Sequence, residues 1–420
     1  MSEKVVSPPR AEAPPTAEEP AAEKEHWWDP LVVPVLAVIT ALAIGALVIV
    51  FSDPEILQSW AGFFRHPLET LRASWDVVYG SYKALFTGAF GDPTTLWQGI
   101  TSGSWSEIQR ALNPLSETIV TATPLIFAGL SVAIGFKAGL FNIGAEGQIT
   151  VGAIVGSMAG FTMTWLPGPI HVIVIVLAGF LGGAVWGAIP GLLKAKTGAH
   201  EVITTIMMNY ISYRLADYCL STTFFRRPDR TDPISKPVVD AFPHLLGSSL
   251  RVHLGIALAL VVSAGVAYLI NRTTVGFEFR AVGFNADASK AAGINATRVF
   301  VLVMTLAGGL AGLGASNQLL SVSPSLTPGY SSGFGFDAIA LALLGRSNAW
   351  GVVAAAFLFG ALRAGSRSMQ AATATPVDIV VVIQALVIVF IAAPSLVRSI
   401  YRIKARRAEG LEVVMKGFGA

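Results

Sequence analysis

Charged residues are scarce in this chain. Asp, Glu, Lys and Arg together make up 13% of its 420 residues, about half of their share in an average soluble domain, whereas hydrophobic residues make up 53%. So few charges cannot cover so large an apolar surface, which excludes a water-soluble globular protein. We therefore predict an all-α protein that crosses a membrane several times, because helices satisfy their own backbone hydrogen bonds in lipid.

Cysteines and cofactor-binding motifs are almost missing as well. The single cysteine, Cys219, excludes an internal disulfide, a cysteine-rich metal cluster and a thiol redox pair. His200 and Glu201 begin an HExxH motif whose second histidine is missing, and no GxxxxGK[ST] phosphate loop occurs. We therefore expect no metal, no cofactor and no catalytic residue in this chain, which is not expected to be an enzyme. The net charge of +3 fits basic cytoplasmic loops of a membrane protein, so nucleic acid is not an expected partner.

Long apolar runs dominate the rest of the sequence. The clearest, 31–51, contains no charged residue and reaches the roughly 20 residues needed to cross a bilayer. The segment 336–346 is too short to cross, and we expect a half-helix buried against its neighbours. In all, we predict a membrane-embedded bundle of about ten transmembrane helices, near 31–51, 115–136, 146–166, 170–193, 201–220, 252–270, 297–320, 336–346, 350–365 and 377–394.

Glycines lie inside these apolar runs at helical spacing. Gly179, Gly183, Gly187 and Gly191 follow one another at intervals of four, and 308–314 reads GGLAGLG. Small residues let membrane helices approach closely. We therefore expect the bundle to be tightly packed.

Composition divides the chain into a membrane domain, 31–395, and two tails. Residues 1–30 are rich in Pro, Ala and Glu, as disordered tails are, and residues 396–420 are basic. Counting crossings from a cytoplasmic N-terminus places both tails and the loop 271–296 in the cytoplasm, and the semi-polar segment 52–114 outside as short interfacial helices. Five basic residues in the loop after 201–220 favour the opposite orientation: Arg226, Arg227, Arg230, Lys236 and Arg251.

The loop 271–298 is the longest clearly polar internal loop. Asn285 is placed to cap a short helix, Asp287 stands in its first turn, Lys290 lies near its end and Gly293 follows it, an order that suits the helix dipole and termination by glycine. A short rigid helix beneath two spans suits a lever that a soluble motor domain could push. An ordinary connecting loop is the alternative.

This loop also carries a family resemblance. Its sequence RAVGFNADASKAAGI resembles the coupling loop of ABC-transporter permeases in the branched-chain amino acid, ribose and nucleoside importer superfamily. Segments 139–156, 197–211 and 335–365 are similar to permeases of its nucleoside branch, whereas 1–30 and 52–114 carry little recognisable signature. The resemblance implies that the following residues couple the chain to an ATPase: Arg280, Gly283, Asn285, Asp287, Lys290, Ala291, Ala292, Gly293 and Ile294.

The same resemblance implies an ABC importer permease fold with a cytoplasmic coupling helix, in the inner membrane of a bacterium. The implied partners are cytoplasmic ABC ATPases that bind ATP and Mg²⁺, a second permease subunit that is a paralogue or an identical copy, and an external substrate-binding protein. The implied solutes are nucleosides or related sugar-containing molecules. They would be translocated by alternating access of one cavity to the two sides of the membrane.

Polar residues at membrane depth are costly and are therefore candidates for the solute pathway. Each candidate also has a structural alternative. Glu146 could be a helix-start carboxylate, the polar residues of 201–209 could form hydrogen bonds between helices, and Asp337 could cap a half-helix. Asn317 and Gln318 are expected at the outer surface, and Arg346, Arg363 and Arg367 as snorkelling or loop charges. The pathway candidates are Asn142, Glu146, Gln148, Glu201, Thr204, Thr205, Asn209, Phe334, Phe336 and Asp337.

One rival function uses the same residues. A secondary transporter coupled to protons or sodium could titrate Glu146, Glu201 and Asp337 at a central cavity. Such a protein would transport without nucleotide, whereas a permease subunit by itself would not drive uptake.

Overall fold

The computed structural model describes residues 29–247 and 249–402. This part of the chain is helical, with two isolated β-bridges in the loop after α8. The helices are α1 (Asp29–Ser52), α2 (Pro54–Ala61), α3 (Pro67–Phe90), α4 (Pro93–Ser102), α5 (Trp105–Lys137), α6 (Ala145–Thr162), α7 (Gly168–Thr197), α8 (Glu201–Ser221), α9 (Gly255–Arg272), α10 (Thr274–Phe284), α11 (Ala286–Ala291), α12 (Ala296–Ser321), α13 (Phe334–Leu344), α14 (Ala349–Thr373), α15 (Val377–Ala392) and α16 (Pro394–Ile400).

A helix stands at each of the ten predicted spans, so the all-α polytopic fold is confirmed. By length and composition, six described helices can cross a membrane, or seven if α15 and α16, which meet at 93°, form one span. Helices α6, α8 and α13 are not among them. The number of ten crossings therefore stays a prediction.

Helices α7 and α12 pack with their backbones in contact. A Cβ atom on Gly183 would lie 2.2 Å from the carbonyl oxygen of Gly308, and one on Gly312 would lie 2.0 Å from that of Gly179. Only glycine permits this approach, because the obstructing atoms belong to the opposite backbone. The tight packing predicted from the glycine spacing is confirmed.

The segment 52–114 is helical, but it is not made of short helices throughout. Its central helix α3 has 24 residues and packs along α14, where a Cβ on Gly365 would lie 2.2 Å from the carbonyl oxygen of Leu85. The other face of α3 exposes large apolar side chains, among them Leu68, Trp75 and Tyr79. This amphipathic face suits a helix at the membrane interface. The location of the segment on the external side of the membrane stays a prediction.

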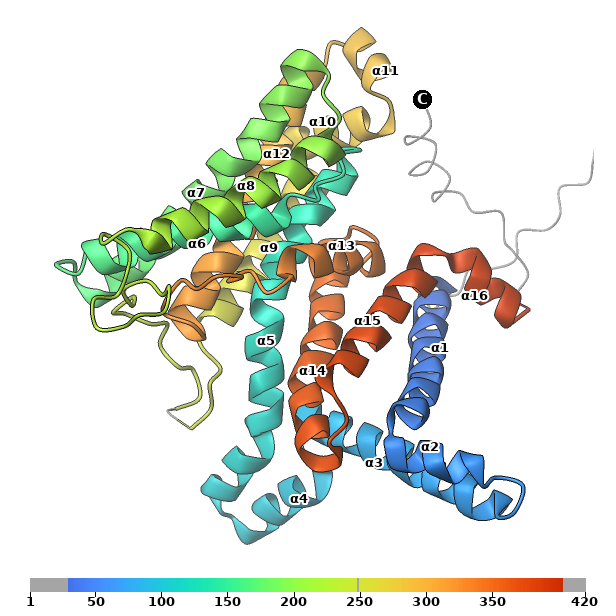
Figure 1. Cartoon of the computed structure of the whole chain (residues 1–420). Coiled ribbons are helices and arrows are strands. Elements are labelled where there is room, and N and C mark those ends of the chain that lie inside the picture. Colours follow the sequence, from blue (N-terminus) through green and yellow to red (C-terminus); the bar gives the residue numbers. More distant parts are fainter. Residues whose placement is uncertain (1–28, 248, 403–420) are drawn as a thin grey trace, which may run out of the picture.

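The two ends of the bundle carry different elements (Figure 1). Helix α11 lies at the top of this view, α16 and the beginning of α1 lie about half-way down on the right, and α2 and α4 lie at the lower end. A hydrogen bond of 3.0 Å between the hydroxyls of Thr40 and Tyr401 joins α1 to the segment just after α16. The two ends of the described chain therefore lie close together, and the sidedness of the termini stays a prediction. The tails themselves, 1–28 and 403–420, lie outside the described residues.

Candidate functional site

Two polar side chains in the break between α5 and α6 satisfy one another. The Asn142 amide nitrogen donates to Gln148 Oε1 at 3.0 Å, and Gln148 Nε2 donates back to Asn142 Oδ1 at 3.2 Å. Asn142 also accepts from the backbone nitrogen of Gly144 and reaches the Ser131 hydroxyl. Both side chains are buried, and this exchange compensates their amides.

Helix α8 is attached to the same break. Asn209 accepts from the backbone nitrogen of Gly147 at 2.8 Å and donates to the carbonyl of Ile143 at 3.0 Å. Thr205 packs beside Gly144 and donates to the carbonyl of its own residue i−4, Glu201. Asn209 thus replaces the hydrogen bonds that the broken helix lacks.

Glu146 joins the beginning of α6 to the beginning of α13. One carboxylate oxygen accepts from the Ser331 hydroxyl at 2.5 Å and from the backbone nitrogen of Gly333 at 3.1 Å, and the other accepts from the backbone nitrogen of Gly335 at 2.7 Å. The residue is 3% exposed. Its charge therefore sits where two helix N-termini meet, and their partial positive charges stabilise it. We call Asn142, Glu146, Gln148, Asn209 and Ser331 the polar seam.

One turn further along α13, Asp337 faces α14. It forms an ion pair of 2.5 Å with Arg363, whose guanidinium also lies 4.8 Å from the ring centre of Phe334. The ring of Phe336 is 48% exposed on the other side. The prediction that Arg363 is a snorkelling or loop charge is wrong, because a carboxylate on the neighbouring helix compensates it.

Glu201 is not a member of the polar seam, but its carboxylate meets the backbone of Phe141 in the same break between α5 and α6. It pairs with Lys194 at 2.6 Å across the turn between α7 and α8, and the Lys194 ammonium lies 5.4 Å from the ring centre of Phe300. The Thr204 hydroxyl donates to backbone carbonyls of its own helix, those of His200 and Glu201. The pathway candidates on α8, Glu201, Thr204, Thr205 and Asn209, therefore serve different contacts.

Among the predicted pathway residues, the polar seam joins Asn142, Glu146, Gln148 and Asn209, whereas Thr204 bonds within its own helix. Every side-chain amide of the polar seam is occupied by protein partners, so these residues hold the break together. The Phe336 ring and the Asp337–Arg363 pair keep free surface. A role for any of these residues in contacting solute stays a prediction. Among the described residues, no cluster of His, Cys, Asp and Glu is placed to hold a metal.

The sequence prediction failed at Asn317 on α12. It was expected at the outer surface, but it is 1% exposed, and neither its Oδ1 nor its Nδ2 has a hydrogen-bond partner. It faces Gly255 at the start of α9 together with the ring of His253. No local signal marks this burial, because it depends on where α9 crosses α12.

The predicted coupling helix is present as α11. Asn285 caps it by accepting from the backbone nitrogens of Asp287 and Ala288 at 3.0 and 2.9 Å, and Lys290 pairs with Asp287 at 3.2 Å. Gly293 follows with a φ of +87°, the left-handed conformation that ends many helices. The local prediction is confirmed at each of these positions, whereas the coupling function is untested.

A second helix, α10, precedes α11 in the segment that was predicted to be a loop. Thr273 caps it by accepting from the backbone nitrogen of Gly276. At its other end Gly283 packs on the turn after α5, where a Cβ atom would lie 2.4 Å from the carbonyl oxygen of Lys137. Gly283 therefore forms the contact that fixes α10 against the end of α5.

Comparison with known proteins gives the family. The model of the family described as branched-chain amino acid transport system / permease component matches residues 115–392. The chain belongs to this family. The match spans the helices from α5 to α15, including the polar seam and the α10–α11 segment. The predicted superfamily is confirmed.

Three curated relatives resemble the permease over most of its length. The guanosine ABC transporter permease protein NupP of Bacillus subtilis is 36% identical over 373 residues, 88% of this chain and 94% of that protein. The nucleoside ABC transporter permease protein NupB of Lactococcus lactis is 34% identical over 79% of this chain and 88% of its own. The glucose ABC transporter permease protein TsgB13 of Haloferax volcanii is 31% identical over 85% and 86%. No solved structure matches the permease.

The likeness to NupP extends past the family match. An alignment over 373 residues cannot fit between residue 115 and residue 420, so it includes most of the segment 52–114. The family match itself begins at residue 115, which agrees with the expectation that this segment carries little family signature.

Proposed function

We propose that this permease is the membrane-spanning subunit of an ATP-driven ABC importer for nucleosides or related sugar-containing solutes. The likeness to permeases named for guanosine, nucleosides and glucose supports the solute class. The observation that carries the mechanism is the attachment of an exposed capped helix, α11, to the end of the membrane helix α5 through α10. The partners in this proposal are cytoplasmic ATPases, a second permease subunit, paralogous or identical, and an external binding protein.

The side chains of α11 are free to contact a partner. The Asp287 side chain is 92% exposed and that of Lys290 60% exposed. Residues Phe279 and Val282 bury the opposite side of the preceding helix α10 in the bundle. A force on α11 would therefore reach α5 through the contact between Gly283 and Lys137. In the proposed cycle, nucleotide binding by the ATPases moves α11 and switches the cavity between the two sides of a bacterial inner membrane, with both termini cytoplasmic.

Within the membrane, the start of α13 is the proposed place of solute contact. Phe336 presents an exposed ring on which a base can stack. Asp337 can exchange part of its pairing with Arg363 for hydrogen bonds to sugar hydroxyls. The remaining pathway candidates would hold the cavity wall rather than touch the solute.

The alternative, a secondary transporter, receives less support from the contacts of its three carboxylates. Glu146 accepts three hydrogen bonds, while Glu201 and Asp337 each pair with a basic side chain. A carboxylate that titrates during transport must lose its compensation at each cycle. Carboxylates that hold such partners fit a structural role better.

The test is reconstitution of the permease in liposomes with its ATPase and binding protein, followed by uptake of labelled guanosine. The informative variant is Ala291→Trp, which adds bulk to the exposed surface of α11 without entering the bundle. Its matched control is Lys196→Trp, an exposed position in the last turn of α7. A substitution at Gly283 would be less clear, because it would also displace α10 from α5.

We expect uptake that requires ATP, loss of both uptake and ATPase co-purification in Ala291→Trp, and retention of both in Lys196→Trp. Guanosine uptake by the permease alone, without ATP, would instead support the secondary transporter. Equal ATPase binding by the two variants would refute the role of α11.

A further inference from the structure

A cavity lies where three apolar helices begin or end. Helices α1 and α14, which are long and apolar enough to cross a membrane, end at Ser52 and Thr373, and α15 begins at Val377. The cavity between them has a volume of about 540 Å³, within the range of about 300–1,000 Å³ of sites for small molecules. We call it the boundary cavity, and its wall includes Ile49, Ser52, Asp53, Glu55, Thr375 and Ile379.

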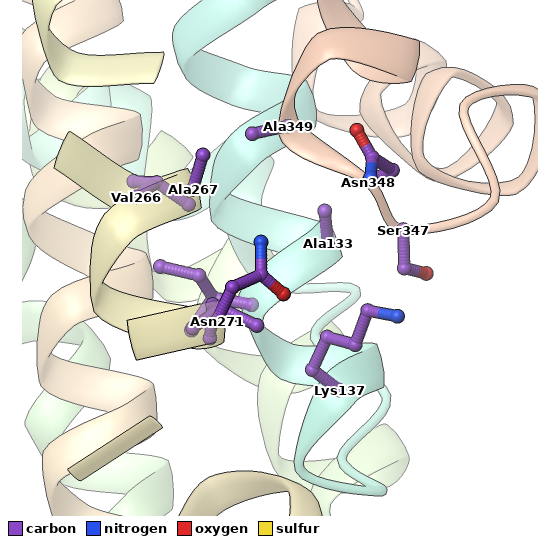
Figure 2. Close-up of a pocket in the computed structure, with 10 residues that line it drawn as sticks. Ala133, Lys137, Val266, Ala267, Asn271, Ser347, Asn348 and Ala349 are labelled. Atoms are coloured by element: carbon purple, nitrogen blue, oxygen red, sulfur yellow. The ribbon is translucent and has the colours of Figure 1, made fainter. Parts of the chain in front are cut away.

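The boundary cavity is much larger than the pocket between α5, α9 and the turn from α13 to α14 (Figure 2). That pocket, at which Ala133, Lys137 and Asn271 project, has a volume of about 30 Å³. Such a volume holds about one or two water molecules. Of these two spaces, only the boundary cavity has room for an organic molecule.

The polarity of the cavity wall changes with depth in the membrane. Ile49 lies in the last turn of α1 and Ile379 in the first turn of α15, and both are buried. At and beyond these helix ends the wall is polar, with Ser52, Asp53 and Thr375. Because the ends of membrane-spanning helices lie at the depth of the lipid headgroups, the wall has the same order of polarity as a lipid molecule.

Hydroxyl groups hold one side of the wall in place. The Thr375 hydroxyl, in the turn between α14 and α15, forms hydrogen bonds with the hydroxyls of Ser81 on α3 at 3.0 Å and of Thr373 at 2.8 Å. Thr375 is 6% exposed. These bonds fix the turn against α3, so the cavity is preformed.

The charge on the wall is negative. Asp53 and Glu55 are the charged residues that line the cavity, and neither forms an ion pair within the described part of the chain. Asp53 Oδ1 caps α2 by accepting from the backbone nitrogens of Glu55 and Ile56, which leaves Oδ2 for another donor. The partial charges of the helix ends cancel, because α1 and α14 end here while α2 and α15 begin here. The cavity therefore attracts a cation.

We propose that the boundary cavity binds a phospholipid whose headgroup ends in a primary ammonium, such as phosphatidylethanolamine. The ammonium donates to Asp53 Oδ2, and an acyl chain lies against Ile49 and Ile379. A primary ammonium has three hydrogen-bond donors, which suit the carboxylate and hydroxyl oxygens of the rim. The two carboxylates repel an acidic lipid. The apolar part of the wall favours a lipid over a soluble amine, which would leave that part in water.

The test measures retention of phosphatidylethanolamine by the purified permease. The protein is exchanged into detergent with equal amounts of phosphatidylethanolamine and phosphatidylglycerol, and bound lipid is counted by native mass spectrometry. Asp53→Asn removes the charge but keeps the cap of α2, because asparagine caps helices as well as aspartate does. Its matched control is Asp92→Asn, since Asp92 caps α4 in the same way, before a proline, outside the cavity.

A second pair of variants tests the space instead of the charge. Ser52→Trp places a bulky ring in the cavity from an exposed position on its wall. Gln98→Trp adds the same ring to an exposed position on α4, outside the cavity.

We expect the natural protein to retain phosphatidylethanolamine in preference to phosphatidylglycerol. Asp53→Asn should weaken this retention about two- to fivefold, the loss for one ion pair that is partly exposed, and Ser52→Trp should abolish it. Asp92→Asn and Gln98→Trp should retain the lipid as the natural protein does.

Three results would overturn the proposal. The first is equal retention of phosphatidylethanolamine in all four variants, or a preference of the natural protein for phosphatidylglycerol. The second is displacement of the lipid by free ethanolamine, which would assign the cavity to a soluble amine. The third is loss of a protein partner from Ser52→Trp with lipid retention unchanged, which would assign the cavity to a protein contact.

Discussion

Glu146 offers the sharpest test of the polar seam. The substitution Glu146→Gln keeps the size of the side chain but removes its charge and one of its two acceptor oxygens. This carboxylate accepts three hydrogen bonds, from Ser331, Gly333 and Gly335. Glutamine must therefore turn its NH₂ group toward at least one donor, which then loses its partner in a buried place.

The cost follows from the lost bonds and the lost charge. Hydrogen bonds between membrane helices are worth about 0.6 kcal/mol on average and up to about 1.7, and those to a charged acceptor belong to the stronger ones. Removing a charge from a helix N-terminus costs roughly 0.3–1 kcal/mol, and here Glu146 serves α6 and α13. We expect Glu146→Gln to destabilise the fold by about 2–4 kcal/mol in total.

The assay is the melting temperature of the purified protein in detergent, followed by tryptophan fluorescence. We expect a decrease of about 3–6 °C for Glu146→Gln, since 1 kcal/mol shifts a large domain by a few degrees at most. Ser331→Ala should give a smaller decrease, and the double variant should cost less than the sum of the two. The control is Glu55→Gln, an exposed carboxylate at the start of α2. If Glu146→Gln had the same melting temperature as this control, the account of the polar seam would be wrong.

Three further predictions concern packing and buried polar groups. Gly183→Ala should lower the melting temperature by several degrees, because its Cβ meets the α12 backbone and overpacking costs about 1–3 kcal/mol. Gly265→Ala, which has open space around it, should leave the melting temperature unchanged. Equal melting temperatures of the two variants would refute the close contact. Asn317→Leu should stabilise the protein by about 1–3 kcal/mol, since two unpaired buried atoms disappear; destabilisation would show that Asn317 has a partner during folding or transport. Burial, with repulsion from His244 and Arg251, lowers the pKa of His253, outside the spans, to about 4. The neutral ring then contributes up to about 3 kcal/mol of stability above pH 6.5 that is lost between pH 6.5 and 4, and His253→Gln should flatten this dependence in melting experiments.

Local features could be predicted from the sequence because they depend on neighbours along the chain. The cap at Asn285, the pair of Asp287 with Lys290 and the termination at Gly293 lie within nine residues, and α11 forms where they predict it. The glycine spacing on α7 and α12 likewise predicts close packing, since helical periodicity places these residues on one face. The apolar middles of the long helices follow from apolar runs for the same reason, but their ends do not, since α5 begins ten residues before the predicted 115 and α14 ends eight residues after the predicted 365.

Contacts between distant residues could not be predicted in this way. Glu146 and Ser331 are 185 positions apart, Asn209 and Gly147 are 62 apart, and Asp337 and Arg363 are 26 apart. The sequence marked most of these side chains as costly in a membrane, but it could not state whether solute or protein compensates them. That depends on how the broken ends of α6 and α13 meet.

The sequence by itself determined that this chain is a helical membrane protein with a short capped helix in its longest polar loop. Composition, apolar length and capping residues act locally, and each is sufficient for its conclusion. Only the tertiary structure decided that α10 is fixed to α5 through Gly283, that the polar seam is satisfied by protein, and that Asn317 is buried without a hydrogen-bond partner. These facts arise from the packing of helices that are far apart in the chain, where the hydrogen bonds and charges of one segment find or lack their partners in another.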